Sequence, residues 1–65
     1  MNLGERIKLA REQKGLSRYS LSVEVGEREC NIIAWETSKR TPRVPALLAI
    51  ANALSTTIDD LVRGE

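Results

Sequence analysis

The sequence of 65 residues contains no histidine, no phenylalanine and a single cysteine, Cys30. Without histidine, neither a Ser–His–Asp set nor a Cys–His set of catalytic residues can be assembled. One cysteine cannot form an intramolecular disulfide, and a zinc site would need ligands that the chain lacks. A chain this short also has too small a core to enclose a substrate pocket. We therefore expect no enzyme activity, no metal, no other cofactor and no small-molecule substrate.

Long apolar runs are also missing. The longest, Ala46 to Ala51, is far shorter than the roughly 20 residues that a membrane-spanning helix needs. The first residues, Met1 to Arg6, do not have the pattern of a signal peptide. These observations predict a cytoplasmic protein without a membrane partner, in which Cys30 stays reduced.

Aromatic residues are scarce, since Tyr19 and Trp35 make up the whole 3%. Apolar residues nevertheless reach 42%, which is typical of a globular chain. The core is therefore expected to be aliphatic, as in helices packed on helices, within a single domain over residues 1–65. The net charge of +1 is nearly neutral, so a basic surface has to come from the arrangement of charges.

Turn signals divide the chain into short helical segments. The first is predicted over residues 2–14, with Asn2 as its N-cap and Gly15 after its end. Ser17 is a good N-cap for a second segment over residues 18–25. A third is expected from about Arg28 to Glu36, although neither Glu27 nor Arg28 is a preferred cap.

Two further helices are predicted in the second half of the chain. Pro45 fits the first turn of the fourth. Its inward stripe is expected to consist of Val44, Leu47, Leu48, Ala51 and Leu54, with Ile50 beside it. Thr57 begins the fifth helix, which Gly64 ends. Since no segment alternates with period two, we predict an all-α fold of five short helices.

The second and third segments are joined around Gly26, which can adopt a positive φ angle and turn the chain sharply. Leu21, Val25 and Ile32 would then meet on the inner side of the corner. Two short helices joined in this way form a helix-turn-helix.

The motifs carried by these segments resemble the Cro and phage-repressor, or XRE-type, helix-turn-helix family. The resemblance covers nearly the whole chain. It is carried by Leu16–Gly26, Ile32, the Trp35-Glu36 pair, the loop Lys39-Arg40-Thr41-Pro42, Ile50–Leu54 and Ile58-Asp59-Asp60-Leu61. It implies a compact, lambda-repressor-like domain of a prokaryotic or phage transcription regulator, most often a repressor.

The resemblance also implies that the third helix enters the major groove of double-stranded DNA. The residues that would face the base edges are Arg28, Glu29, Cys30, Asn31 and Ala34. Their chemistry suits the task, since arginine can read guanine, asparagine adenine and glutamate cytosine, while small side chains can touch the thymine methyl. As isolated features, the same charged residues would be interpreted as solvated surface.

Five further residues are predicted to contact phosphates: Arg18, Tyr19, Lys39, Arg40 and Arg43. Arg18 begins a helix, where backbone N–H groups favour an anion, and the other basic residues form the densest basic patch in the chain. The resemblance further implies a structural ion pair between Arg11 and Glu36, and Trp35 is expected to belong to the core. The protein would bind an inverted-repeat operator as a homodimer.

The chain departs from the family pattern at several positions. Glutamine is usual where Arg18 stands, alanine at Ser22 and an aliphatic residue at Glu27, whose charge is expected to point to solvent. Two alternatives stay open: a helix-turn-helix module that binds a protein and has lost DNA, which the near-neutral charge, Glu27 and Glu29 favour, and the antitoxin of a toxin–antitoxin pair. DNA binding is distinguished from the protein-binding module by whether Lys39, Arg40, Arg43 and Arg18, rather than the acidic residues, dominate the face on the outer side of the third helix.

Overall fold

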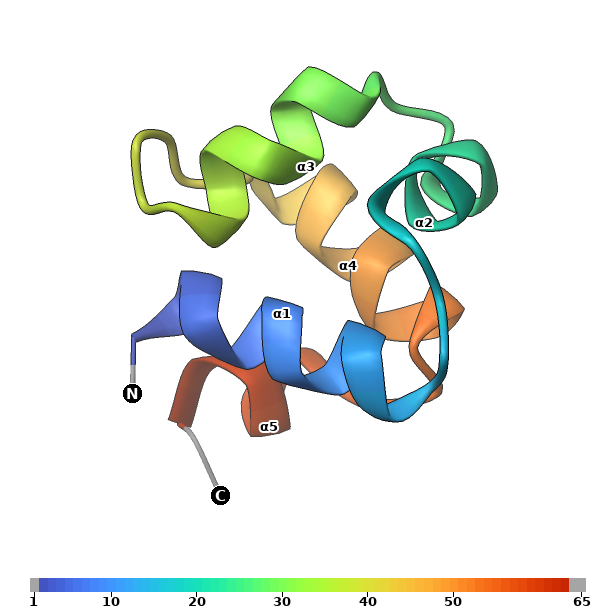
Figure 1. Ribbon diagram of the computed structural model, residues 1–65. Helices are drawn as coiled ribbons and strands as arrows, with labels where there is room; N and C mark the ends of the chain where they lie inside the picture. The colour runs from blue at the N-terminus through green and yellow to red at the C-terminus, as the bar shows by residue number, and fades with distance from the viewer. Residues whose placement is uncertain (1, 64–65) are drawn as a thin grey trace.

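The computed structural model describes residues 2–63, which form five helices and no strand (Figure 1). The helices are α1 (Leu3–Gln13), α2 (Arg18–Val25), α3 (Glu29–Glu36), α4 (Val44–Ala53) and α5 (Ile58–Arg63). The prediction of an all-α fold of five helices is therefore confirmed. No helix in this part of the chain is both long and apolar enough to cross a membrane.

Side-chain caps explain where several helices begin. Asn2 and Glu5 form a capping box at α1, in which Asn2 Oδ1 accepts from the Glu5 N–H at 2.9 Å. Ser17 caps α2 by accepting from the Ser20 N–H at 3.0 Å. At α5, Thr57 Oγ1 accepts from the Asp60 N–H at 3.1 Å. The predicted end of the fifth helix at Gly64 lies outside the described residues.

The start of α3 differs from those of α1, α2 and α5. Arg28 stands at the N-cap with extended backbone angles, and its side chain makes no capping hydrogen bond. The helix therefore begins at Glu29, one residue later than predicted. Since a missing cap leaves backbone N–H groups at the N-terminus of α3 without a side-chain partner, local sequence contributes little to fixing this end.

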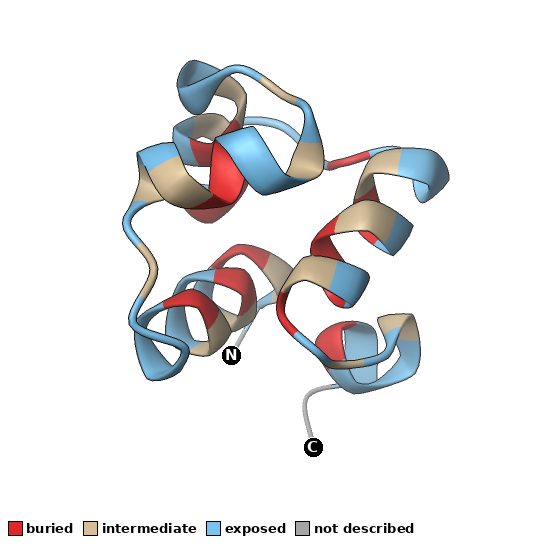
Figure 2. Cartoon of the chain, turned by 90° about the vertical axis from the view of Figure 1, so that its right-hand side faces the viewer, coloured by how far each residue is buried: buried red, intermediate tan, exposed pale blue. Residues whose placement is uncertain are grey.

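The core is aliphatic, as expected, and lies where the helices face one another (Figure 2). Its fully buried side chains come from four helices and are Ile7, Leu21, Ile32 and Ile50. Trp35 is also buried, and Val25 packs against the cluster at the corner between α2 and α3. Burial of apolar area at about 25 cal/mol per Å² is the main favourable term for a chain of this size.

The predicted inward stripe of α4 is partly wrong. Leu47, Ala51 and Leu54 are buried. Val44 and Leu48, in contrast, are 71% and 50% exposed. Ile50, expected beside the stripe, is fully buried. The helix is therefore rotated relative to the prediction, because a helix as apolar as α4 has no polar face that would define its orientation.

Gly4 allows α1 and α3 to approach closely. A Cβ atom at this position would lie 2.4 Å from the backbone oxygen of Trp35 and 2.8 Å from that of Glu36. Both neighbours are backbone atoms, which cannot rotate away as a side chain can. The first turn of α1 therefore packs directly on the C-terminal turn of α3, and a glycine is needed for this contact.

Candidate nucleic-acid interface

The corner between α2 and α3 has the geometry predicted for a helix-turn-helix. Gly26 has a φ angle of 78°, in the left-handed region that favours glycine. The N–H groups of Gly26 and Glu27 both donate to the carbonyl oxygen of Ser22, at 2.9 and 3.0 Å. These bonds terminate α2 and direct the chain into α3 (Figure 1).

One side of α3 is buried and the other is open. Ile32, Trp35 and Glu36 face the interior. Of the residues predicted to face base edges, Arg28, Glu29 and Cys30 are exposed, while Asn31 and Ala34 are half-buried. Ile33, which was not predicted to face DNA, is also exposed. The first turn of α3 is therefore available to a partner.

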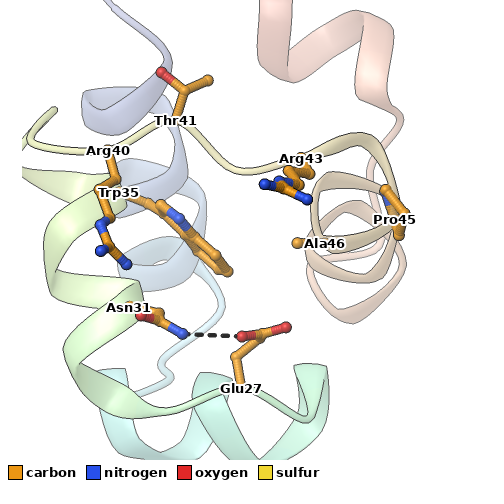
Figure 3. A pocket seen from close by; sticks show the side chains of 8 residues that line it. All are labelled: Glu27, Asn31, Trp35, Arg40, Thr41, Arg43, Pro45 and Ala46. Atoms are coloured by element: carbon orange, nitrogen blue, oxygen red, sulfur yellow. Dashed lines mark hydrogen bonds between the residues drawn. The ribbon is translucent and has the colours of Figure 1, made fainter.

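Asn31 and Ala34 differ in their surroundings. Asn31 lies on the flank of α3 that faces the start of α4, and its amide Nδ2 donates to Glu27 at 3.0 Å (Figure 3). The carbonyl oxygen of Ala34 accepts from the N–H groups of Lys39 and Arg40, at 2.9 and 3.2 Å. The backbone of residues 39–42, here called the basic loop, is thus hydrogen-bonded directly to α3.

A pocket lies between α3 and the N-terminus of α4 (Figure 3). Its lining residues are Glu27, Asn31, Trp35, Arg40, Thr41, Arg43, Pro45 and Ala46. Two guanidinium groups and one carboxylate therefore share this space, beside the open side of α3. Of the predicted phosphate contacts, Arg40 and Arg43 belong to the pocket, while Lys39 is exposed in the preceding loop.

The N-terminus of α4 adds positive potential at the same place. Arg43 is its N-cap, and no side chain caps the helix there. Helix N-termini carry partial positive charge and present N–H groups that bind anions. The pocket rim is thus suited to a phosphate oxygen, with charge from Arg40 and Arg43 and donors from the backbone.

Glu36 is the centre of a buried ionic network. Arg11 Nε donates to its Oε2 at 2.7 Å, and Arg11 Nη2 donates to its Oε1 at 3.3 Å. Arg11 Nη1 also donates to the carbonyl oxygen of Leu16 at 2.8 Å. The side chain of Glu36 is 0% exposed. Because a buried charge is tolerated only with partners, the network fixes α1 against the end of α3.

Arg18 also belongs to this network. Its Nε donates to Oε1 of Glu36 at 3.1 Å, and its side chain remains 35% exposed. The structure thus places Arg18 at the carboxylate of Glu36, a contact that sequence reasoning missed. Tyr19, the other predicted phosphate contact of α2, is 64% exposed.

Glu27 was expected to point to solvent, and this expectation was wrong. The residue is half-buried, accepts the hydrogen bond from Asn31 and lines the same pocket as Arg40 and Arg43 (Figure 3). The four-residue spacing of Glu27 and Asn31 is the one signal that could have indicated the contact. It was obscured because Glu27 lies before the helix begins.

Comparison with known proteins gives a consistent result. A helix-turn-helix family model matches residues 7–61. The P22 c2 repressor, in a crystal structure with a synthetic operator, superposes with a TM-score of 0.95 at 32% identity, covering 100% of this chain and 98% of that one. The solution structure of that repressor's DNA-binding domain gives a TM-score of 0.91 at 33% identity, covering 94% and 80%.

A second regulator is similar over most of the fold. SinR, the master regulator for biofilm formation, in a crystal structure with DNA, gives a TM-score of 0.87 at 27% identity, covering 91% of this chain and 95% of that one. No protein of curated function matches the sequence significantly. The family match and the similarity to the P22 c2 repressor establish that the chain belongs to the XRE-type helix-turn-helix family.

Proposed function

We propose that this protein binds double-stranded DNA sequence-specifically in the cytoplasm and acts as a transcriptional repressor. The observation that carries the proposal is the match over the whole chain to a repressor in complex with a synthetic operator. The exposed first turn of α3 and the cationic pocket rim beside it supply the chemistry that this role needs. The proposal covers residues 1–65 as one DNA-binding domain.

In the proposed complex, α3 lies in the major groove and its side chains read base edges. The exposed guanidinium group of Arg28 pairs with a guanine, and Glu29 accepts from a cytosine amino group. Cys30 and Ala34 contact thymine methyl groups, and Asn31 reads adenine. Each good bidentate pair discriminates by about 1–3 kcal/mol against the wrong base.

Phosphate contacts are assigned to the residues around this helix. The basic loop contains Lys39 and Arg40, and Arg43 follows it as the N-cap of α4. The start of α2 contains Arg18 and Tyr19. Arg18 bonds Glu36 through Nε, and the proposal assigns its terminal Nη groups to a phosphate. If about four side chains neutralise phosphates, log affinity falls with log salt at a slope near −3.6.

The proposal includes a homodimer on an inverted repeat. A single α3 reads only a few base pairs, so two copies about one helical turn apart are needed for an operator of useful length. A contact surface between copies is expected around Ser55, Thr57 and Ile58, between α4 and α5.

Selection from a random duplex pool at low, stated salt tests the proposal, with Arg28→Ala as the variant and Lys8→Ala, on exposed α1 surface, as the matched control. We expect an enriched inverted repeat, with preference relaxed at one base pair per half-site by Arg28→Ala alone. A single enriched half-site would contradict the dimer but not the DNA binding. Absence of enrichment would overturn the function and favour a protein-binding module.

A further inference from the structure

We infer that Glu27 determines specificity by positioning Asn31, and that it holds the Asn31 amide in the orientation that reads adenine. The inference rests on the proposed function and deepens it. Its basis is the hydrogen bond of 3.0 Å from Asn31 Nδ2 to Glu27 Oε1, which is partly shielded from solvent (Figure 3). The resemblance to the family implies an aliphatic residue at this position, so the contact is a property of this chain.

Backbone hydrogen bonds fix the position of Glu27, whose carboxylate accepts from Asn31. The N–H of Glu27 donates to the carbonyl oxygen of Ser22 at 3.0 Å, next to the bond from Gly26 to the same oxygen. These bonds hold Glu27 at the end of α2, while Asn31 belongs to the first turns of α3. The carboxylate is therefore held by one helix of the corner and positions a side chain of the other.

The chemistry of the amide makes this contact directional. A carboxylate can only accept hydrogen bonds, so Nδ2 must face Glu27 and Oδ1 must point away. One N–H is used by Glu27, and reading adenine requires that this is the N–H remote from Oδ1, so that the N–H beside Oδ1 stays free. A donor next to an acceptor is the arrangement that pairs with adenine N7 and N6. Without Glu27, the amide could rotate by half a turn and exchange the two groups.

Glu27 shares the pocket with two cationic side chains. Arg40, from the loop, and Arg43, the N-cap of α4, also line it (Figure 3). None of the ion pairs formed by residues 2–63 includes Glu27, Arg40 or Arg43. The carboxylate thus bonds Asn31, and both guanidinium groups stay available to a phosphate.

The inference is tested by the same duplex selection, applied to the full chain and its Glu27→Val, Glu27→Gln, Asn31→Ala and Glu27→Val/Asn31→Ala variants. Valine gives the family's type of side chain and should fold, which circular dichroism verifies. Glutamine is the matched control, because it removes the charge but keeps an acceptor oxygen.

We expect Asn31→Ala to remove the preference for an A·T pair at one position per half-site. Glu27→Val should reduce the preference at the same position by about three- to ten-fold, part of what a bidentate pair provides. The double variant should lose no more there than Asn31→Ala alone. Glu27→Gln should lose less than Glu27→Val, because its oxygen can still accept from Asn31 although its NH2 group also permits the reversed amide. Both Glu27 variants should bind all sequences more tightly, because a negative charge near phosphates is removed.

Three results would overturn the inference. They are an unchanged A·T preference in Glu27→Val, an equal loss in Glu27→Gln and Glu27→Val, or an effect of Asn31→Ala at no particular base pair. Each requires that the unmodified chain enriches an operator. If the unmodified chain enriches nothing, the proposed function itself fails, so the two failures are distinguishable.

Discussion

Two glutamates lie at the two ends of α3, and they differ in burial and in hydrogen-bond partners. Glu36, at its C-terminal end, is fully buried and accepts hydrogen bonds from Arg11 and Arg18. Glu27, just before its N-terminal end, is half-buried and accepts from the neutral amide of Asn31. One carboxylate therefore ties the helix to the core, and the other lies at the edge of the proposed interface. Variants at the two ends should separate stability from DNA recognition.

The largest effect is expected at the Glu36 end. Glu36→Leu removes the buried carboxylate and leaves Arg11 with only the exposed Glu12, 4.0 Å from its Nη2, as a counter-charge, which should lower the free energy of unfolding by about 3–5 kcal/mol. Urea unfolding followed by circular dichroism measures the loss. The double variant Arg11→Met/Glu36→Leu should recover part of it, because no buried charge is then stranded. Equal stability of Glu36→Leu and the unmodified chain would contradict the structural role of the network.

A smaller loss is expected from Gly4→Ala, which affects the same end of α3 without changing any charge. The added Cβ would meet the backbone oxygens of Trp35 and Glu36. Forcing α1 away from α3 should cost about 1–3 kcal/mol, as overpacking usually does. Thermal unfolding measures it. Lys8→Ala, at an exposed position of α1, is the control and should change little.

Arg18 links the two roles, so its substitution should affect both modestly. Arg18→Ala should reduce the free energy of unfolding by no more than about 1 kcal/mol, because the side chain is partly solvated and Arg11 still neutralises Glu36. Its proposed phosphate contact predicts weaker binding to all duplexes and a salt slope shallower by about 0.9. Titrations at several salt concentrations measure the slope. An unchanged slope would assign Arg18 to the core network alone.

The smallest effect on stability is expected at the Glu27 end. Glu27→Gln keeps an acceptor for Asn31 and should change the free energy of unfolding by no more than about 0.5 kcal/mol. Glu24→Gln, at an exposed position of α2, changes the net charge equally and serves as the control. A loss in Glu27→Gln comparable to that in Glu36→Leu would mean that the two glutamates do not divide stability and recognition.

Most of the helical framework could be predicted because its signals are local. Asn2, Ser17 and Thr57 lie at helix starts, and Gly26 turns the chain between α2 and α3 as the sequence indicated. Each of these effects depends on residues within a few positions of one another. The predicted start of α3 was one residue early, at a helix start without a side-chain cap.

Apart from the contact between Glu27 and Asn31, what was missed depends on contacts between distant segments. Gly4 is needed because of backbone atoms more than thirty residues away, and Arg18 meets Glu36 across 18 positions. The orientation of α4, with Val44 outside, follows from how its neighbours pack. Such contacts leave no periodic or local pattern in one sequence. The assignments of individual side chains to bases and phosphates stay predictions for the same reason.

The bond of the basic loop to Ala34 has a mechanical consequence. Because Lys39 and Arg40 both donate backbone hydrogen bonds to this carbonyl oxygen, the loop and the end of α3 are joined as one body. In the proposed complex, the spacing between the base-reading helix and these cations is therefore fixed by the protein. Any mismatch with groove width must be accommodated by bending or twisting the DNA. The protein would then prefer DNA sequences that deform easily, including at base pairs that it does not contact.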